Sequence, residues 1–390
     1  MRTLDRLASE ARDLAAGGAA DDSAAEHEAA RQLQICNACR YCEGFCAVFP
    51  AMTRRLEFPS ADVHYLANLC HNCGACLHAC QYASPHEFAV DMPQAMARVR
   101  GRTYARHAWP GGFARLYARN GLTLAAALAG ALALMLALAI AMQGDVGALW
   151  RRLPGGSFYA LLPHGLLVAL FAPAFAFALL AIGVGVSRFW RDEVPGPAGA
   201  AALGEAAQHA LRLSYLDGGH GEGCTNDDDA WTLARRRAHH LVFYGFASCF
   251  AATCVATLYH YAFGWHAPYG WASLPKGLGV AGGVAMVIGC AWLWRLRVRR
   301  HPQHVLAEQR GMDLGFIALL GLAAASGIAL ALLRETAAMP LVLCVHLGAV
   351  MALFATMPYG KFVHGAYRAA ALVKWAIERR QPNRLQLGNE

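Results

Sequence analysis

The stretches CNACRYCEGFC, residues 36–46, and CHNCGACLHAC, residues 70–80, repeat one cysteine spacing and determine how the chain is organised. Both read C-x2-C-x2-C-x3-C, and together they contain eight of the thirteen cysteines: Cys36, Cys39, Cys42, Cys46, Cys70, Cys73, Cys76 and Cys80. In bacterial ferredoxins the thiolates of this run bind a cubane iron–sulfur cluster. Two copies therefore predict an N-terminal ferredoxin-like domain that binds two 4Fe–4S clusters.

The fourth cysteine of each run decides how the ligands divide. In two-cluster ferredoxins this cysteine binds the neighbouring cluster. The rule predicts Cys36, Cys39, Cys42 and Cys80 for cluster 1, and Cys46, Cys70, Cys73 and Cys76 for cluster 2. In the commonest ferredoxin run a proline follows the fourth cysteine, whereas Ala47 and Gln81 stand there in this chain. The cross-ligation therefore stays open, while the prediction of two clusters does not depend on it.

Disulfides and zinc are the alternatives for this set of cysteines. Disulfide frameworks are typical of secreted chains, but residues 1–30 lack the apolar core of a signal peptide. Zinc sites use pairs of C-x2-C units. They do not require three closely spaced cysteines followed by a fourth, a pattern that occurs in both runs of this chain. The spacing favours iron–sulfur clusters.

The composition indicates a membrane protein with a soluble cysteine-rich head. Hydrophobic residues make up 57% of the chain and charged residues 15%, whereas soluble proteins contain about 25% charged residues. The net charge of +8 raises the question of nucleic acid. The arginines lie beside apolar runs, however, and form no basic stripe with interleaved aromatics. We expect contact with the lipid bilayer and none with nucleic acid.

Six stretches reach the length of about 20 apolar residues that crosses a bilayer. They are residues 122–142, 158–186, 239–263, 277–294, 314–333 and 341–362. The sequence therefore predicts an all-α membrane protein with a six-helix transmembrane bundle. The expected domains are an N-terminal helical extension (1–34), the two-cluster domain (35–120), spans one and two (121–187), an insert (188–238), a haem-binding core of spans three to six (239–367) and a tail (368–390).

Lysines and arginines in short loops predict the orientation, because they are retained in the cytoplasm. The fourth connection and the C-terminal tail are rich in them, whereas the third carries only Lys276 and the fifth only Arg334. Arg151 and Arg152 in the first connection are an exception. Both termini are therefore expected in the cytoplasm. The insert 188–238 is then cytoplasmic too, either as a solvated loop or as a docking surface for a partner.

Histidines in apolar spans are functional candidates. His346 and His364 are about five whole helical turns apart, so they would share one face of the sixth span. In the third span, His239 lies about 60° short of whole turns from His260, whereas His240 would point about 160° away. We therefore prefer His239 and keep His240 as the alternative ligand. Since the two spans are antiparallel, the expected pairs are His239 with His364, and His260 with His346.

Two imidazoles on separate helices are the axial ligands that a b-type haem requires. The pairs therefore predict one or two b haems. The alternative for any single histidine near a span end is anchoring at the interface, which we expect for His164. The cysteines at positions 249, 254, 290 and 344 lie scattered in apolar runs, and we assign them no chemistry.

Four longer motifs resemble those of a known family: CNACRYCEGFCAVFP (36–50), CHNCGACLHACQYASPHEFAVDMP (70–93), ARRRAHHLVFYGFASCFAATCVATLYHY (234–261) and MPYGKFVHG (357–365). The chain resembles the tricarballylate utilisation protein B family, also called citrate utilisation protein B. The six spans are also similar to the membrane haem (gamma) subunits of respiratory nitrate reductases. Carried over, that pattern matches His239, His260, His346 and His364.

The resemblance implies a protein of the bacterial inner membrane that transfers electrons and has no catalytic residue of its own. It would reoxidise the flavin of an FAD-dependent tricarballylate dehydrogenase, which forms cis-aconitate, and reduce the quinone pool. No Gly-rich dinucleotide motif follows a strand, so we expect no FAD or NAD on this chain. The alternatives are a quinol-oxidising subunit of a heterodisulfide-reductase-like or nitrate-reductase-like complex, and a membrane redox sensor.

Overall fold

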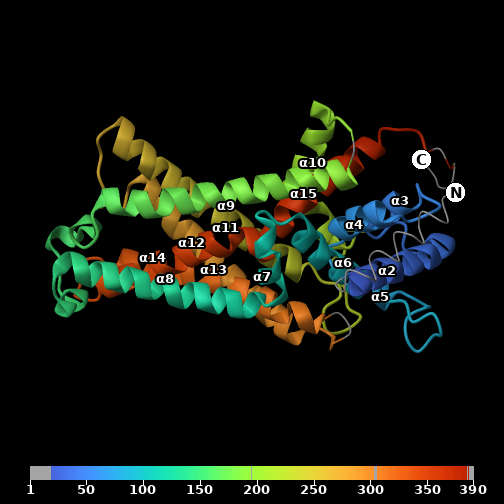
Figure 1. Ribbon diagram of the computed structural model, residues 1–390, viewed down its shortest axis with the longest axis horizontal. Coiled ribbons are helices and arrows are strands. Elements are labelled where there is room, and N and C mark those ends of the chain that lie inside the picture. Colours follow the sequence, from blue (N-terminus) through green and yellow to red (C-terminus); the bar gives the residue numbers. More distant parts are fainter. Residues whose placement is uncertain (1–18, 195, 303–304, 384, 386–390) are drawn as a thin grey trace.

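The computed structural model describes residues 19–194, 196–302, 305–383 and 385. Within these residues, six helices are long and apolar enough to cross a membrane, which confirms the expected spans. They lie roughly along the long axis of the molecule (Figure 1). The six are α8 (Asn120–Gln143), α9 (His164–Glu193), α11 (Ala234–Ala262), α12 (Leu274–Arg299), α13 (Ala307–Leu333) and α14 (Met339–Thr356).

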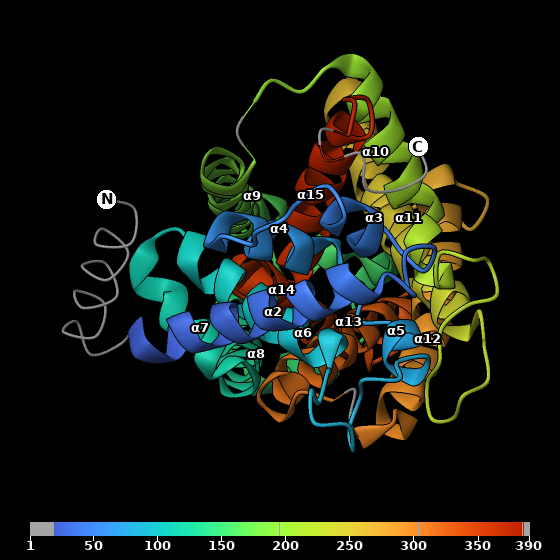
Figure 2. The ribbon, with the colours of Figure 1, turned by 90° about the vertical axis from the view of Figure 1, so that its right-hand side faces the viewer.

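A head of shorter helices covers one end of this bundle and faces the viewer in Figure 2. It contains α2 (Ala19–Cys39), α3 (Val48–Met52), α4 (Ser60–Leu69), α5 (Ala75–His78) and α6 (Met92–His107), together with the C-terminal helix α15 (His364–Glu378). The connections contain α7 (Arg115–Ala118), α10 (Ala200–Arg212) and short 3-10 turns: η1 (Gly111–Ala114), η2 (Val146–Trp150), η3 (Pro154–Gly156), η4 (Phe158–Ala160), η5 (Ser214–Asp217), η7 (Met357–Tyr359) and η8 (Lys361–Val363).

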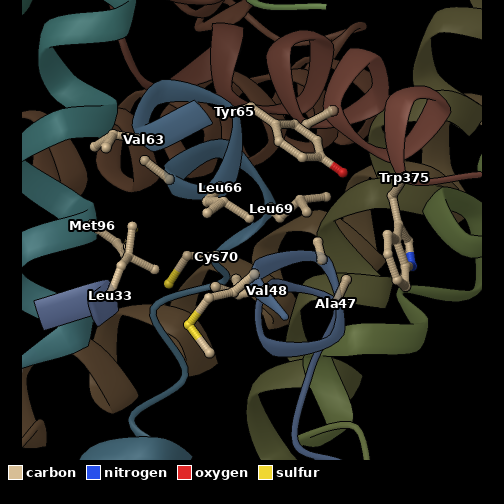
Figure 3. Close-up of a cluster of buried hydrophobic side chains, with 14 of the residues drawn as sticks. Leu33, Ala47, Val48, Val63, Tyr65, Leu66, Leu69, Cys70, Met96 and Trp375 are labelled. Carbon is tan, nitrogen blue, oxygen red and sulfur yellow. The ribbon is translucent and has the colours of Figure 1, made fainter. Parts of the chain in front are cut away.

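The head has a hydrophobic core of its own, to which the C-terminal helix contributes (Figure 3). Side chains from several helices meet there, among them Leu33, Val48, Leu66, Leu69, Met96 and Trp375. Burying one large apolar side chain stabilises a fold by about 1.5–3 kcal/mol. Because Trp375 belongs to α15, the core fixes the end of the chain in the head.

Ion pairs strengthen this attachment of α15. Arg55 in the head pairs with Glu378 of α15, and its Nε lies 2.7 Å from an oxygen of Asp62. The hydroxyl of Tyr65 donates a hydrogen bond to Glu378 at 3.1 Å. The helix that follows the sixth span in the sequence is therefore anchored in the head.

Helix α2 crosses the expected domain boundary at residue 35. It continues to Cys39, so Cys36 and Cys39 lie in its last turns. Residues 1–18 of the expected extension lie outside the described residues. The second span also starts later than predicted, at His164. Pro163 precedes it, and proline disfavours the helical conformation in the residue before it.

The sixth span is not one helix, and this corrects the expectation for residues 341–362. Helix α14 ends at Thr356, two 3-10 turns follow with extended Gly360 between them, and α15 starts at His364. Pro358 lies in the first of these turns, where it cannot continue the preceding hydrogen-bond pattern. His346 and His364 therefore belong to different helices, and the argument from whole helical turns was wrong.

Close packing of α11 on α12 depends on glycines. A Cβ atom at Gly282 would lie 2.7 Å from the carbonyl oxygen of Gly245, and one at Gly245 would lie 2.8 Å from that of Gly282. Small residues let helix backbones approach in this way within membranes.

We expect Gly282→Val to force these two helices apart, at a cost of roughly 1–3 kcal/mol, as is typical of overpacking. Gly183→Val on α9 is the matched control, because nothing lies within 4 Å of a Cβ atom there. Thermal unfolding in one detergent checks the prediction. The midpoint should fall for the Gly282 variant and stay close to wild type for the control, and equal midpoints would contradict it.

Candidate cofactor sites in the head and at its junction with the bundle

The eight cysteines line two adjacent cavities in the head. The first has a volume of about 250 Å³ and is lined by Cys36, Cys39, Cys42, Cys76 and Cys80. The second cavity has a much smaller volume and is lined by Cys46, Cys70, Cys73 and Cys76. Apart from Cys76, which lines both, this division is the one that the crossed grouping predicts. The ligation itself stays a prediction.

The first thiol group suits a cluster better than a single metal ion. Among the described residues, no three Cys, His, Asp or Glu side chains converge closely enough to hold one ion. A zinc site needs its sulfurs at about 2.3 Å from the metal, whereas these thiols surround a larger space. Burial raises the pKa of Cys36 and of Cys42 to about 12, and the neighbouring thiols, including Cys80, add to this. Iron binding would displace these protons.

Local backbone geometry curls the second run around its cavity. Gly74 has φ of 89°, in the left-handed region that glycine tolerates best, and it precedes the short helix α5. The backbone N–H of Asn72 lies 3.3 Å from the sulfur of Cys70. Such N–H donors are among the features that tune iron–sulfur potentials.

The insert 188–238 closes over this second group. Cys224 is buried within hydrogen-bonding distance of Cys73, and this contact lowers the pKa of Cys73. The ring of Trp231 lies 6.0 Å from that of Phe45, next to Cys46. The insert is therefore not a solvated loop in this region. Sequence reasoning gave Cys224 no role, although a ninth cysteine in a long polar connection was the available signal.

Arginines from both the head and the bundle hold the loop of residues 70–73. Arg100 donates to the carbonyl oxygen of Cys70 at 2.5 Å, and Arg368 donates to the same oxygen. Arg235 donates to the carbonyl oxygen of Asn72 at 2.8 Å. Arg300 bonds that oxygen too, and its guanidinium lies 3.1 Å from the side-chain oxygen of Asn72. This loop therefore forms the contact between the cysteine head and the bundle.

The structure brings His239 and His364 together at this junction. Their ring centres lie 6.1 Å apart, with the ring planes at 75°. Imidazole nitrogens bind metals at about 2 Å, so rings at this distance leave room for one metal atom between facing nitrogens. His364 Nδ1 is hydrogen-bonded to the carbonyl oxygen of Lys361, which leaves Nε2 for a ligand. His239 Nδ1 is buried and has no hydrogen-bond partner among the described residues.

The donor set of this pair fits a haem, for which His239 and His364 are the candidate ligands. His240, the alternative, lies elsewhere. It lines an open groove of about 500 Å³ between α11 and α12, together with Arg237 and Tyr244. Of these two histidines, His239 is the one that lies beside His364.

The structure gives His260 and His346 different neighbours. His260 stacks on His164, with ring centres 4.0 Å apart, and its Nδ1 lies 3.0 Å from that of His266. His346 instead lies against α13, where its Nδ1 is 3.1 Å from the carbonyl oxygen of Ala323. Rings stacked at 4.0 Å leave no space for an iron atom between them. The expected second pair is therefore without support, and sequence reasoning missed the grouping of three histidines.

His71 is a further residue that the sequence did not single out. It follows Cys70 directly, lines the second cavity and accepts a hydrogen bond of 2.8 Å from Arg368. Arg368 lies one helical turn after His364 on α15. Burial and the neighbouring Arg368 lower the pKa of His71 well below its ordinary value, so the ring stays neutral. His71 and Arg368 thus link the second thiol group to the histidine pair.

This fold defines a membrane protein that carries an iron–sulfur domain on a bundle of six apolar helices. The chain belongs to the citrate utilization protein B family. The family model "Citrate utilization protein B" matches residues 115–384, and "Citrate utilization protein B Fer4-like domain" matches residues 29–106. A relative from Escherichia coli, "Citrate utilization protein B", is 52% identical over 381 residues, which cover 98% of each chain. These matches confirm the resemblance. No solved structure matches this chain.

Proposed function

We propose that this chain takes electrons from the reduced flavin of a tricarballylate dehydrogenase, or of a dehydrogenase acting on a citrate-related tricarboxylate, and delivers them to membrane quinone. Bound iron–sulfur clusters and b haem would supply one-electron carriers between a two-electron donor and a two-electron acceptor. The eight cysteines of the two runs would hold two 4Fe–4S clusters, and His239 and His364 would hold haem b. The protein would lie in the bacterial inner membrane with the head and both termini in the cytoplasm.

The observation that carries this proposal is the link, through Arg368, between the second thiol group and the histidine pair. Cys70 and His71 are bonded to Arg368, four residues after His364 on the same helix. The first thiol group opens toward the surface beside Tyr41, which is 69% exposed. A donor docked at that surface would therefore reach the histidine pair through the two thiol groups in series. A redox sensor has no need of such a series.

Membrane vesicles that contain the chain and the flavoprotein partner test the proposal. We expect tricarballylate to drive reduction of a soluble quinone analogue only when both proteins are present. Cys46→Ser should abolish this activity, whereas Cys254→Ser, which changes an exposed cysteine of α11, should not. Quinone reduction by the partner alone at the full rate would overturn the proposal. Electron flow only from quinol to the chain would favour the quinol-oxidising alternative.

A further inference from the structure

The four arginines that hold residues 70–73 come from four separate parts of the fold. Arg100 lies on α6, Arg235 on α11 and Arg368 on α15, and Arg300 follows α12. All four guanidinium groups point at two backbone carbonyls, those of Cys70 and Asn72, in the loop between the ligands Cys70 and Cys73.

We propose that these four arginines make the second cluster the stronger electron acceptor of the two, so that an electron entering at the first cluster moves toward the histidine pair. This inference rests on the proposed function, because it assumes that both thiol groups bind clusters. A cluster becomes more negative when it is reduced, and nearby fixed positive charge stabilises that state. Guanidinium groups keep their charge at every physiological pH.

The positive charge is buried and poorly balanced by carboxylates. Arg100 is 5% exposed and Arg300 is 7% exposed. Among the described residues, Asp313 is the carboxylate that acts on Arg300, but it already lies 2.7 Å from Lys361 and 2.5 Å from Arg297. Burying an unmatched cation is costly. An anionic cluster in the second cavity would offset that cost.

The first cavity has a different environment. Neither cavity has a lysine or an arginine among its described lining residues. Beside the first cavity, Arg40 donates to one backbone carbonyl, that of Asn37. Beside the second, four arginines donate to the carbonyls of Cys70 and Asn72. The two sites therefore differ in nearby fixed charge although their cysteine spacing is the same. Burial alone would have the opposite effect, because a less solvated site disfavours the more negative reduced state. The arginines would reverse the order of the two reduction potentials that burial alone would produce.

Redox titration followed by low-temperature EPR, on purified protein with its cofactors bound, tests the inference. Arg100→Gln and Arg368→Gln should each lower the potential of one cluster, the one that Cys46→Ser removes, and leave the other unchanged. The equilibrium constant for electron exchange between the clusters should shift by roughly tenfold per charge, as for a unit charge several ångströms away at intermediate dielectric constant. Arg368→Lys keeps the charge, so this variant should retain most of the wild-type potential.

Arg31→Gln is the matched control, because Arg31 is an exposed arginine of the head that pairs with Glu28, and neither potential should change. If Arg100→Gln or Arg368→Gln fails to retain the second cluster, the potential of that cluster is measured in Arg235→Gln instead. Unchanged potentials in the arginine variants, or equal shifts of both clusters, would overturn the inference. That result, with quinone reduction intact, would leave the proposed function standing. If the arginine variants shift the potential of one cluster only but no quinone is reduced, the inference would stand and the proposed function would fail.

Discussion

Replacing Cys46 with serine is expected to remove the cluster held by Cys70, Cys73 and Cys76 and to leave the other cluster in place. Cys46 belongs to the first cysteine run, but it lines the second cavity. Cys80→Ser should give the converse result, because Cys80 lines the first cavity with Cys36, Cys39 and Cys42. EPR spectra of the two reduced variants should each show one cluster signal, and the two signals should differ.

Assignment of these signals decides between crossed and uncrossed ligation. Arg368→Gln labels the second cluster, because its guanidinium bonds the Cys70 carbonyl. A signal that shifts in Arg368→Gln should be absent from Cys46→Ser and present in Cys80→Ser. If Cys46→Ser instead retains the shifting signal, each run binds its own cluster. Cys254→Ser, far from both cavities on α11, should keep both signals.

Replacing His364 with alanine is expected to abolish the b-type spectrum, and so is His239→Ala. The two rings lie 6.1 Å apart, and an iron atom that loses one axial imidazole loses its low-spin bis-histidine state. His240→Ala should leave the spectrum close to wild type, because His240 lines the groove between α11 and α12. Visible spectra and haem content of the purified variants check this.

The remaining membrane histidines provide the contrast. His346→Ala should retain the haem that depends on His364, because His346 is hydrogen-bonded to the Ala323 carbonyl on α13. His260→Ala should retain it as well, since His260 stacks on His164. Loss of all b-type absorbance in His346→Ala or in His260→Ala, with His364→Ala unaffected, would show that the haem ligands were chosen wrongly.

The spans and the iron–sulfur domain could be predicted from the sequence because their signals are local. The length of the apolar stretches predicted the six helices, and the cysteine spacing predicted the Fer4-like head. Boundaries were less certain where proline intervened, as at Pro163 and Pro358. The helix breaks after Thr356, so His346 and His364 do not share one face of a continuous helix. His364 nevertheless lies beside His239. The antiparallel order of the helices was sufficient to bring those two together.

The junction between head and bundle could not be predicted in this way. Arg100, Arg235, Arg300 and Arg368 are far apart in the sequence, and on their own each resembles a charge at the end of a membrane span. Only the fold brings them to one loop. The same holds for Cys224, which reaches Cys73 because the insert folds back over the head. Residues that act through tertiary contacts leave no spacing pattern to recognise.

In the proposed function, the thiol groups and the histidine pair form one electron path. The most direct test is the visible spectrum of the purified protein after anaerobic addition of the flavoprotein partner and tricarballylate. A b-type absorption band should appear in wild type and fail to appear in Cys46→Ser, although dithionite should still reduce the haem in that variant. A band that appears equally fast in both proteins would contradict the claim, because the haem would then be reduced without the second thiol group.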